Sequence, residues 1–191
     1  MGPDTSAAVD HLRETLVERR TVFTGRLLSL HDDVVALPSG SQAGREVIHH
    51  PGAVVVVAVT GDGRIVLVRQ WRHAVGGALW ELPAGTRDAG EAAATTAARE
   101  LREETGYAAR RWSALGEAYV SPGYSRELLS FFLAEELTVG DASAAEDEVL
   151  DVRLFQPAEV TALVRQGMTD CKTVGGLALA GRLPAVPWTQ G

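Results

Sequence analysis

Cysteine is nearly absent from this chain of 191 residues, which has one residue of that kind, Cys171. A single cysteine excludes a disulfide within the chain, so we expect a protein of a reducing compartment, the cytoplasm. No catalytic signature surrounds Cys171, which favours an inert, half-buried thiol over a nucleophile. At this length, apolar side chains can stabilise one domain without cross-links.

Long apolar runs and concentrated positive charge are also missing. The longest apolar run, residues 53–59, is far shorter than the roughly 20 residues of a membrane-spanning helix, so we expect no membrane partner. The first ten residues have no basic segment followed by an apolar one, so we expect no secretory signal. The net charge of −7, without a segregated basic patch, argues against nucleic acid as a partner.

Short apolar runs separated by turn-forming residues predict alternating strands and helices. The valine run at 53–59 is typical of a strand buried on both faces, and Gly-Asp-Gly at 61–63 predicts a hairpin to a strand over 64–73. Three helices are expected, near 88–105, 157–167 and 169–181, which gives a mixed α/β (α+β) class with helices flanking a mixed sheet. The expected divisions are a flexible N-terminus at 1–14, antiparallel strands at 15–48, the main domain at 49–183 and a tail at 184–191.

The first of these helices has clear end signals. Asp88 is placed to cap it, with Glu91 three residues later as in a capping box, and Gly106 fits a left-handed C-cap. At 100° per residue the acidic side chains fall within one arc of the helix, and small or apolar side chains fill the neighbouring arc that should face the core. The acidic arc contains Glu100, Glu103 and Glu104, and the apolar arc contains Ala94, Ala97, Ala98 and Leu101.

The three neighbouring carboxylates have two interpretations. Each like-charged pair costs about 0.2–0.5 kcal/mol in an isolated helix. This cost is small, so the carboxylates could simply form a solvated acidic face that Arg99 and Arg102 partly neutralise. Alternatively, carboxylates at this rigid spacing suit Mg²⁺ or Mn²⁺, which prefer oxygen ligands and would turn the repulsion into attraction. The preceding segment "ELPAG", residues 81–85, could add backbone carbonyls to such a site.

The spacing of these residues resembles the Nudix box without a mismatch. Gly85 is followed after five residues by Glu91, and after seven more by Arg99-Glu100-Leu101, two further glutamates and Gly106-Tyr107. The resemblance implies a Nudix hydrolase with an α/β/α sandwich, which uses Mg²⁺ to cleave a nucleoside diphosphate linked to another group. It also implies roles along the motif. The metal ligands would be Glu100, Glu104 and the carbonyl of Ala84; Glu103 would ligate or support a metal, Arg99 would orient the carboxylates, and Glu91 would be structural.

Other segments look like the ADP-ribose pyrophosphatase branch from about Thr15 to Leu179. They include "ELPAG" and "SPGYSRE", in which Pro122 lies fifteen residues after Tyr107, near the position of the marker proline of that branch. By analogy, Arg72 and Arg45 would contact phosphate oxygens, for which a guanidinium fork is well suited. The aromatic rings of Trp71, Trp80 and Tyr124 could stack on adenine, although such rings are more often part of a core. The complete substrate-binding set is Arg45, Trp71, Arg72, Glu81, Pro122, Tyr124 and Glu127.

Two features leave the substrate and the catalytic base open. Arg126 stands where the branch usually has an acid or amide, and the spacing of Tyr124 resembles diadenosine-polyphosphate hydrolases. The base would be Glu146 or Glu148 in an acidic loop, with the other acting as a metal ligand. Another alternative is a non-catalytic ADP-ribose sensor, which the intact set of glutamates disfavours. Family resemblance further implies a homodimer that exchanges its N-terminal strands.

Overall fold

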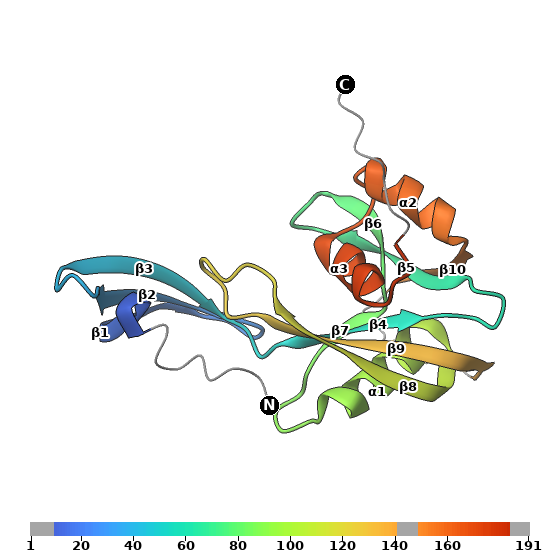
Figure 1. Ribbon diagram of the computed structural model, residues 1–191, viewed down its shortest axis with the longest axis horizontal. Coiled ribbons are helices and arrows are strands. Elements are labelled where there is room, and N and C mark those ends of the chain that lie inside the picture. Colours follow the sequence, from blue (N-terminus) through green and yellow to red (C-terminus); the bar gives the residue numbers. More distant parts are fainter. Residues whose placement is uncertain (1–9, 141–148, 184–191) are drawn as a thin grey trace. The chain divides into compact units, whose positions relative to one another are not determined.

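The computed structural model describes residues 10–140 and 149–183, which divide into two compact units (Figure 1). The first unit contains residues up to Pro51 together with Ser121–Glu127. The second contains Gly52–Val120 and the residues from Leu128 onward. None of the helices in the described ranges is long and apolar enough to cross a bilayer.

The first unit is an antiparallel sheet of three strands in the order β1-β2-β3. The strands are β1 (Thr15–Thr24), β2 (Ser29–Ala36) and β3 (Gln42–His49), preceded by a short 3₁₀ helix at Asp10–Leu12. All residues of β1 are exposed, and within the three strands only two side chains of β2 are buried, Asp33 and Val35. This sheet therefore has almost no core of its own.

The second unit contains two sheets and three α-helices. One sheet has the order β7-β4-β9-β8 and the other the order β10-β5-β6. Strand β4 pairs antiparallel with β7 and parallel with β9, so the mixed sheet predicted from the sequence is confirmed. The elements are β4 (Ala53–Ala58), β5 (Ile65–Arg72), β6 (Gly77–Glu81), β7 (Ala84–Thr86), α1 (Ala93–Thr105), β8 (Tyr107–Tyr119), β9 (Leu128–Val139), β10 (Asp151–Phe155), α2 (Pro157–Arg165) and α3 (Cys171–Leu179).

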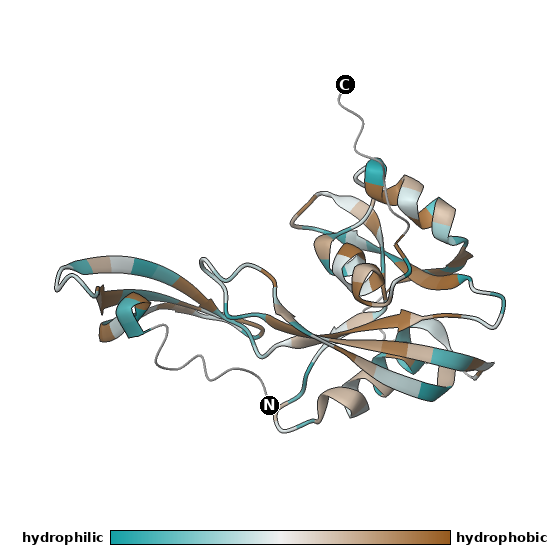
Figure 2. Ribbon diagram, viewed as in Figure 1, coloured by the Kyte–Doolittle hydropathy of each residue, from teal (hydrophilic) through white to brown (hydrophobic). Residues whose placement is uncertain are grey.

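Strand β4 is buried on both faces, as its valine run predicts. Successive side chains of a strand point to opposite faces, so β4 contributes to two separate clusters. Val55 and Val57 pack in a cluster with Leu177 of α3, whereas Val54 and Val56 pack with α1. Figure 2 shows the apolar character of the strands at the centre of this unit. Strand β4, which pairs with the strand β7 that precedes the acidic helix, is thus anchored from both sides.

The predicted hairpin of β4 and β5 is wrong. The turn exists, because the Thr60 amide donates to the Arg64 carbonyl at 2.9 Å. Beyond one bridge between Val59 and Ile65, however, the two strands separate into different sheets. Both edges of β4 are already occupied by β7 and β9, so β5 pairs with β6 and β10 instead. The sequence pattern could not reveal these distant partners.

Helix α1 begins later than predicted. Its N-cap is Ala92, which makes no side-chain cap bond, so the prediction that Asp88 caps the helix is wrong. The predicted contact of Glu91 back to Asp88 is present, because the Asp88 amide donates to the Glu91 carboxylate at 3.5 Å, but that carboxylate also accepts from the side chains of Thr96 and Arg99. The other end agrees with prediction, because Gly106 adopts the left-handed conformation at φ 71° and its amide bonds the Arg102 carbonyl.

The buried face of α1 also differs in part from prediction. Ala97 and Leu101 are buried as expected, but Ala94 and Ala98 are exposed. The helix is rotated so that Thr96, Glu104 and Thr105 face inward. One of the predicted metal-binding carboxylates, that of Glu104, therefore lies inside the unit and not on a solvated face.

Candidate active site

Arg99 connects the carboxylates of the acidic helix. Its Nη1 donates to Glu100 Oε1 at 2.8 Å and to Glu103 Oε2 at 3.0 Å. Its Nε and Nη2 donate to the two oxygens of Glu91 at 3.3 and 3.0 Å. The hydrogen bonds that Arg99 donates to Glu91, and then those to the other two carboxylates, raise the pKa of Arg99 despite its partial burial. The arginine is therefore a permanent cation that holds three carboxylates in place.

Glu104 is held by a different contact, to the strand that precedes the helix. Its Oε2 accepts a hydrogen bond from the Ala84 amide at 3.0 Å. Next to Ala84, Gly85 passes so close to the helix that a Cβ there would lie 1.9–2.3 Å from the carboxylate of Glu100. A larger side chain at that position would require the Glu100 carboxylate or the backbone to move. The glycine of the motif thus allows the backbone of β7 to approach the acidic side chains directly.

These residues have the chemistry of a site for a hard divalent cation. The donor set consists of carboxylates and nearby backbone, which are the oxygen ligands that Mg²⁺ and Mn²⁺ prefer. Within 10–140 and 149–183, no three His, Cys, Asp or Glu side chains are already arranged around an ion position. Glu100 and Glu103 are turned toward Arg99 instead. A cation would therefore compete with Arg99 for carboxylate oxygens that are already assembled.

Glu91 has a structural position within this group. Hydrogen bonds from Arg99, and then from Thr96, lower the pKa of Glu91 from its ordinary value of 4.5 to about 2. The Thr96 hydroxyl donates to Glu91 Oε2 at 2.8 Å. The charged carboxylate therefore binds Arg99 through Nε and Nη2, whereas Nη1 binds Glu100 and Glu103.

A second group of charges surrounds the buried Glu81 at the end of β6. Arg72 donates to both oxygens of Glu81, from Nε at 2.9 Å and from Nη2 at 2.6 Å. Lys172 donates to Glu81 Oε2 and to Asp170. Burial alone would raise the pKa of Glu81, but the bonds from Arg72 and Lys172 outweigh it and hold the pKa below its ordinary value. Of the predicted substrate residues, Glu81 is thus buried, and Arg72 is partly exposed.

Sequence analysis missed three residues of this region. Asp170 caps α3 by accepting from the Thr173 amide at 3.0 Å, Lys172 bonds Glu81, and the Thr173 hydroxyl accepts from the buried Leu82 amide at 2.9 Å. The sequence signal that could have indicated them is the N-cap pattern Asp-x-x-Thr at 170–173. This pattern includes a charged residue, Lys172, in the first turn of a helix that packs on the rest of the unit. The partners of Lys172 and Thr173 on β6 and just after it, Glu81 and Leu82, lie 91 positions earlier, so spacing alone does not connect them.

The two tryptophans have different environments. Trp80 is buried in the core of the second unit, with its ring 4.8 Å from that of Phe155 in an edge-on arrangement. It is therefore a core residue and not a platform for adenine. Trp71, by contrast, is 62 % exposed and remains free to meet a ligand. Burial separates two aromatic side chains that look equivalent in the sequence.

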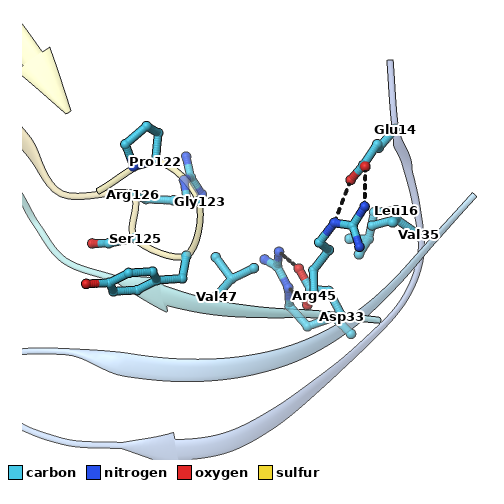
Figure 3. A pocket seen from close by; sticks show the side chains of 12 residues that line it. Glu14, Leu16, Asp33, Val35, Arg45, Val47, Pro122, Gly123, Ser125 and Arg126 are labelled. Atoms are coloured by element: carbon cyan, nitrogen blue, oxygen red, sulfur yellow. Dashed lines mark hydrogen bonds and ion pairs between the residues drawn. The ribbon is translucent and has the colours of Figure 1, made fainter. Parts of the chain in front are cut away.

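The first unit has a pocket of about 490 Å³, formed by its strands and the segment Ser121–Glu127. That segment is fixed to β3 because the Ile48 amide donates to the Tyr124 carbonyl at 2.7 Å. Figure 3 shows Arg45 in the pocket wall, paired with Glu14 at 3.1 Å from Nε. The lining residues are Glu14, Leu16, Arg19, Asp33, Val35, Arg45, Val47, Pro122, Gly123, Tyr124, Ser125 and Arg126.

The structure therefore gathers three predicted substrate residues, Arg45, Pro122 and Tyr124, at one pocket. Arg126, the residue that departs from the branch pattern, lines the same pocket. Glu127 lies beside it in the chain, and its carboxylate is 4.0 Å from His50 Nδ1. The two candidates for the base, Glu146 and Glu148, lie outside the described residues.

Comparison with known proteins gives a family match. The model of the NUDIX domain matches residues 49–171. A solved structure described as an ADP compounds hydrolase superposes with a TM-score of 0.76 at 21 % identity, over 89 % of this chain and 94 % of that one. This likeness independently supports the arrangement of sheets and helices described above.

Several curated relatives are similar over nearly the whole chain. An ADP-ribose pyrophosphatase of Bacillus subtilis is 41 % identical over 165 residues, 85 % of this chain and 89 % of the relative. An ADP-ribose pyrophosphatase of Mycobacterium tuberculosis is 39 % identical over 185 residues, 95 % of this chain and 87 % of the relative. A methanol dehydrogenase activator of Bacillus methanolicus is 35 % identical over 164 residues, 84 % of this chain and 89 % of the relative.

Proposed function

The chain belongs to the NUDIX family, and we propose that it hydrolyses the pyrophosphate of ADP-ribose to AMP and ribose 5-phosphate. The observation that carries this proposal is the complete carboxylate set of α1, assembled around Arg99 and Ala84. Two ADP-ribose pyrophosphatases are about 40 % identical to this chain, and the similarity covers most of the length of each relative. A nucleotide is therefore the substrate class, and the enzyme is a Nudix hydrolase.

We assign the divalent metal of this family to the acidic helix, with Mg²⁺ as the cation and Mn²⁺ as a substitute. Glu100, Glu104 and the Ala84 carbonyl would hold it, supported by Glu103. When bound, such a metal lowers the pKa of a water molecule and neutralises charge on the diphosphate. Arg99 keeps the carboxylates ionised and oriented through charge-assisted hydrogen bonds.

The remaining roles fall to residues outside the helix. Glu146 or Glu148 would take the proton of the attacking water as general base. Arg72 would hold a phosphate oxygen with its partly exposed guanidinium, and Glu81 would fix that guanidinium. Arg45, Pro122, Tyr124 and Glu127, with Trp71, would form the remaining contacts to the nucleotide.

We also propose a homodimer in which residues 15–48 are exchanged between two copies, while 49–183 form the catalytic domain of each copy. In support, β1 is exposed along its whole length although it is rich in apolar side chains. In most proteins an apolar sheet surface of this kind is covered by another part of the chain or by a partner, because exposed apolar patches favour association. The large exposed side chains are Leu16, Val17, Val22 and Phe23. With one cysteine in the chain, we place this enzyme in the cytoplasm.

Product analysis with purified protein tests the proposed reaction. ADP-ribose, a diadenosine polyphosphate, a nucleotide sugar and NADH are each incubated with Mg²⁺, and the products are separated by anion-exchange chromatography. We expect AMP and ribose 5-phosphate in equal amounts, with kcat/KM for ADP-ribose well above that for the other substrates. The Glu104→Gln variant should form neither product at a comparable rate.

Two other results would contradict the proposal. A preference for the diadenosine polyphosphate would mean that Tyr124 and Arg126, and not Pro122, indicate the substrate. Tight binding of ADP-ribose without turnover of any compound would identify a sensor instead of an enzyme.

A further inference from the structure

The chain contains a single lysine, Lys172, among 18 lysine and arginine residues, and its side chain is mostly buried. It belongs to a group of four charged residues, Arg72, Glu81, Asp170 and Lys172, which we call the charge tetrad. Lys172 bridges the two carboxylates, and Arg72 is bound to Glu81 through two of its three guanidinium nitrogens. None of the catalytic steps above uses Lys172.

Exposure decreases from Arg72 toward the centre of the tetrad. The side chain of Arg72 is 39 % exposed, that of Lys172 15 % and that of Glu81 2 %. The four charges cancel while Lys172 is present. Without it, the tetrad would have an excess negative charge at partial burial, where charges interact more strongly than in water. That excess would repel an anionic diphosphate at Arg72.

The ammonium group is also held in a fixed place. The segment before α3 is hydrogen-bonded to β6, because the Trp80 amide donates to the Met168 carbonyl at 3.0 Å and the Thr169 hydroxyl donates to the Trp80 carbonyl at 2.6 Å. The Leu82 amide donates to Thr173 on the other side of Lys172. A compact ammonium can reach both carboxylates from this position, whereas a guanidinium presents a larger planar fork.

We infer that Lys172 is a positioning residue for Arg72. By sharing Glu81 and offsetting Asp170, it keeps the Arg72 end of the tetrad attractive to a phosphate. Nη1 of Arg72 takes no part in the two bonds to Glu81 and would contact the substrate. This inference rests on the proposed function, in which Arg72 contacts the diphosphate. It assigns to Lys172 an effect on substrate binding and none on the chemical step.

Charge-balance variants test the inference. Lys172→Met removes the positive charge at similar volume, and Lys172→Met/Asp170→Asn removes one charge of each sign. Asparagine caps helices as well as aspartate does, so the substitution at 170 preserves the cap of α3. For Lys172→Met we expect KM for ADP-ribose to rise about tenfold with kcat within about twofold, the pattern of lost uniform binding. The double variant should recover most of this loss.

A merely structural role gives a different result, because the second substitution would then add to the damage of the first. An unchanged KM in Lys172→Met, or a double variant weaker than Lys172→Met, would overturn the inference. Thermal unfolding of each variant shows whether it is folded at the assay temperature. A variant that is not folded there is replaced by Lys172→Gln, alone and with Asp170→Asn.

Binding without divalent metal separates this inference from the proposed reaction. The dissociation constants of ADP-ribose are measured by calorimetry for the wild type and the variants. Protein labelled only at lysine gives one side-chain NMR signal, which should shift when ADP-ribose binds. If the wild type binds ADP-ribose but does not hydrolyse it, the proposed reaction fails while these constants still decide the role of Lys172. If it binds neither ADP-ribose nor pyrophosphate without metal and hydrolyses no substrate with Mg²⁺, both fail.

Discussion

Glu104 illustrates how one side chain can serve structure and chemistry together. It is buried, and one of its oxygens accepts from the Ala84 amide. In Glu104→Gln the amide oxygen can keep that bond while the negative charge is lost. We expect kcat for ADP-ribose to fall on the order of a hundredfold or more, as for loss of one electrostatic catalytic group. Steady-state kinetics with Mg²⁺ provide the measurement.

The matched control for this substitution is Glu136→Gln. Glu136 lies on β9, is exposed, and within the described residues forms an ion pair with the exposed Arg111. We expect its kcat to stay within about twofold of the wild type. Near-normal turnover of Glu104→Gln would show that the metal ligands are misassigned.

Glu91 makes the stability of the fold depend on pH. Its folded-state pKa of about 2 lies below the ordinary value of 4.5, so its ionised form stabilises the fold. That contribution is complete above about pH 5 and is lost as the pH falls from about 4.5 toward 2. We expect the melting temperature of Glu91→Gln to lie below that of the wild type by a constant amount above pH 5. The difference should shrink in acid, and a constant difference down to pH 2.5 would contradict this assignment.

At the scale of elements, the close approach of β7 to α1 depends on Gly85. In Gly85→Ala the new Cβ would collide with the carboxylate of Glu100, so strand and helix must separate or the carboxylate must rotate. We expect kcat to fall at least about tenfold, because a misplaced catalytic group is costly. Gly61→Ala is the control, since a Cβ there meets no atom within 4 Å. Equal activity of the two variants would contradict the role of Gly85.

The docking of α3 on β6 depends on the buried hydroxyl of Thr173. Thr173→Val keeps the shape but leaves the Leu82 amide without its acceptor. Burying an unsatisfied amide costs about 1–3 kcal/mol, and we expect that loss in the free energy of unfolding by urea. Thr173→Ser retains the hydroxyl and should lose less. A valine variant as stable as the wild type would mean that this bond is not needed.

Contacts between residues close together in the sequence were easier to predict than contacts between residues far apart in it. The spacing of Arg99, Glu100 and Glu103 is local to one helix, so their contacts could be anticipated from the sequence. The start of α1 differs from the prediction because the helix begins after Glu91, whose carboxylate binds Arg99, eight residues away, in addition to the Asp88 amide. The partners of β4 and of Lys172 lie far along the chain, where neither periodicity nor spacing indicates which elements meet. Trp71 and Trp80 differ only through that tertiary packing.

At the scale of the whole molecule, the exposed apolar surface of β1 predicts association. Deletion of residues 1–40 should give a monomer without activity, as measured by light scattering and ADP-ribose hydrolysis. Val22→Asp is a milder change that leaves the strand in place and should weaken the dimer, since a charge would be buried there. Val139→Asp, at a more exposed valine of β9, should not weaken it. A fully active, truncated monomer would contradict strand exchange.

The parallel pairing of β4 with β9 also bears on how the protein is made. Ala53 pairs with Leu129, so the valine strand leaves the ribosome long before its partner is synthesised. At about 5–20 residues per second this interval lasts several seconds. During it, a short valine-rich segment without charge resembles the sequences that aggregate most readily. We therefore expect newly made chains to depend on chaperones during translation. Expression at a lower growth temperature should improve the yield of folded enzyme.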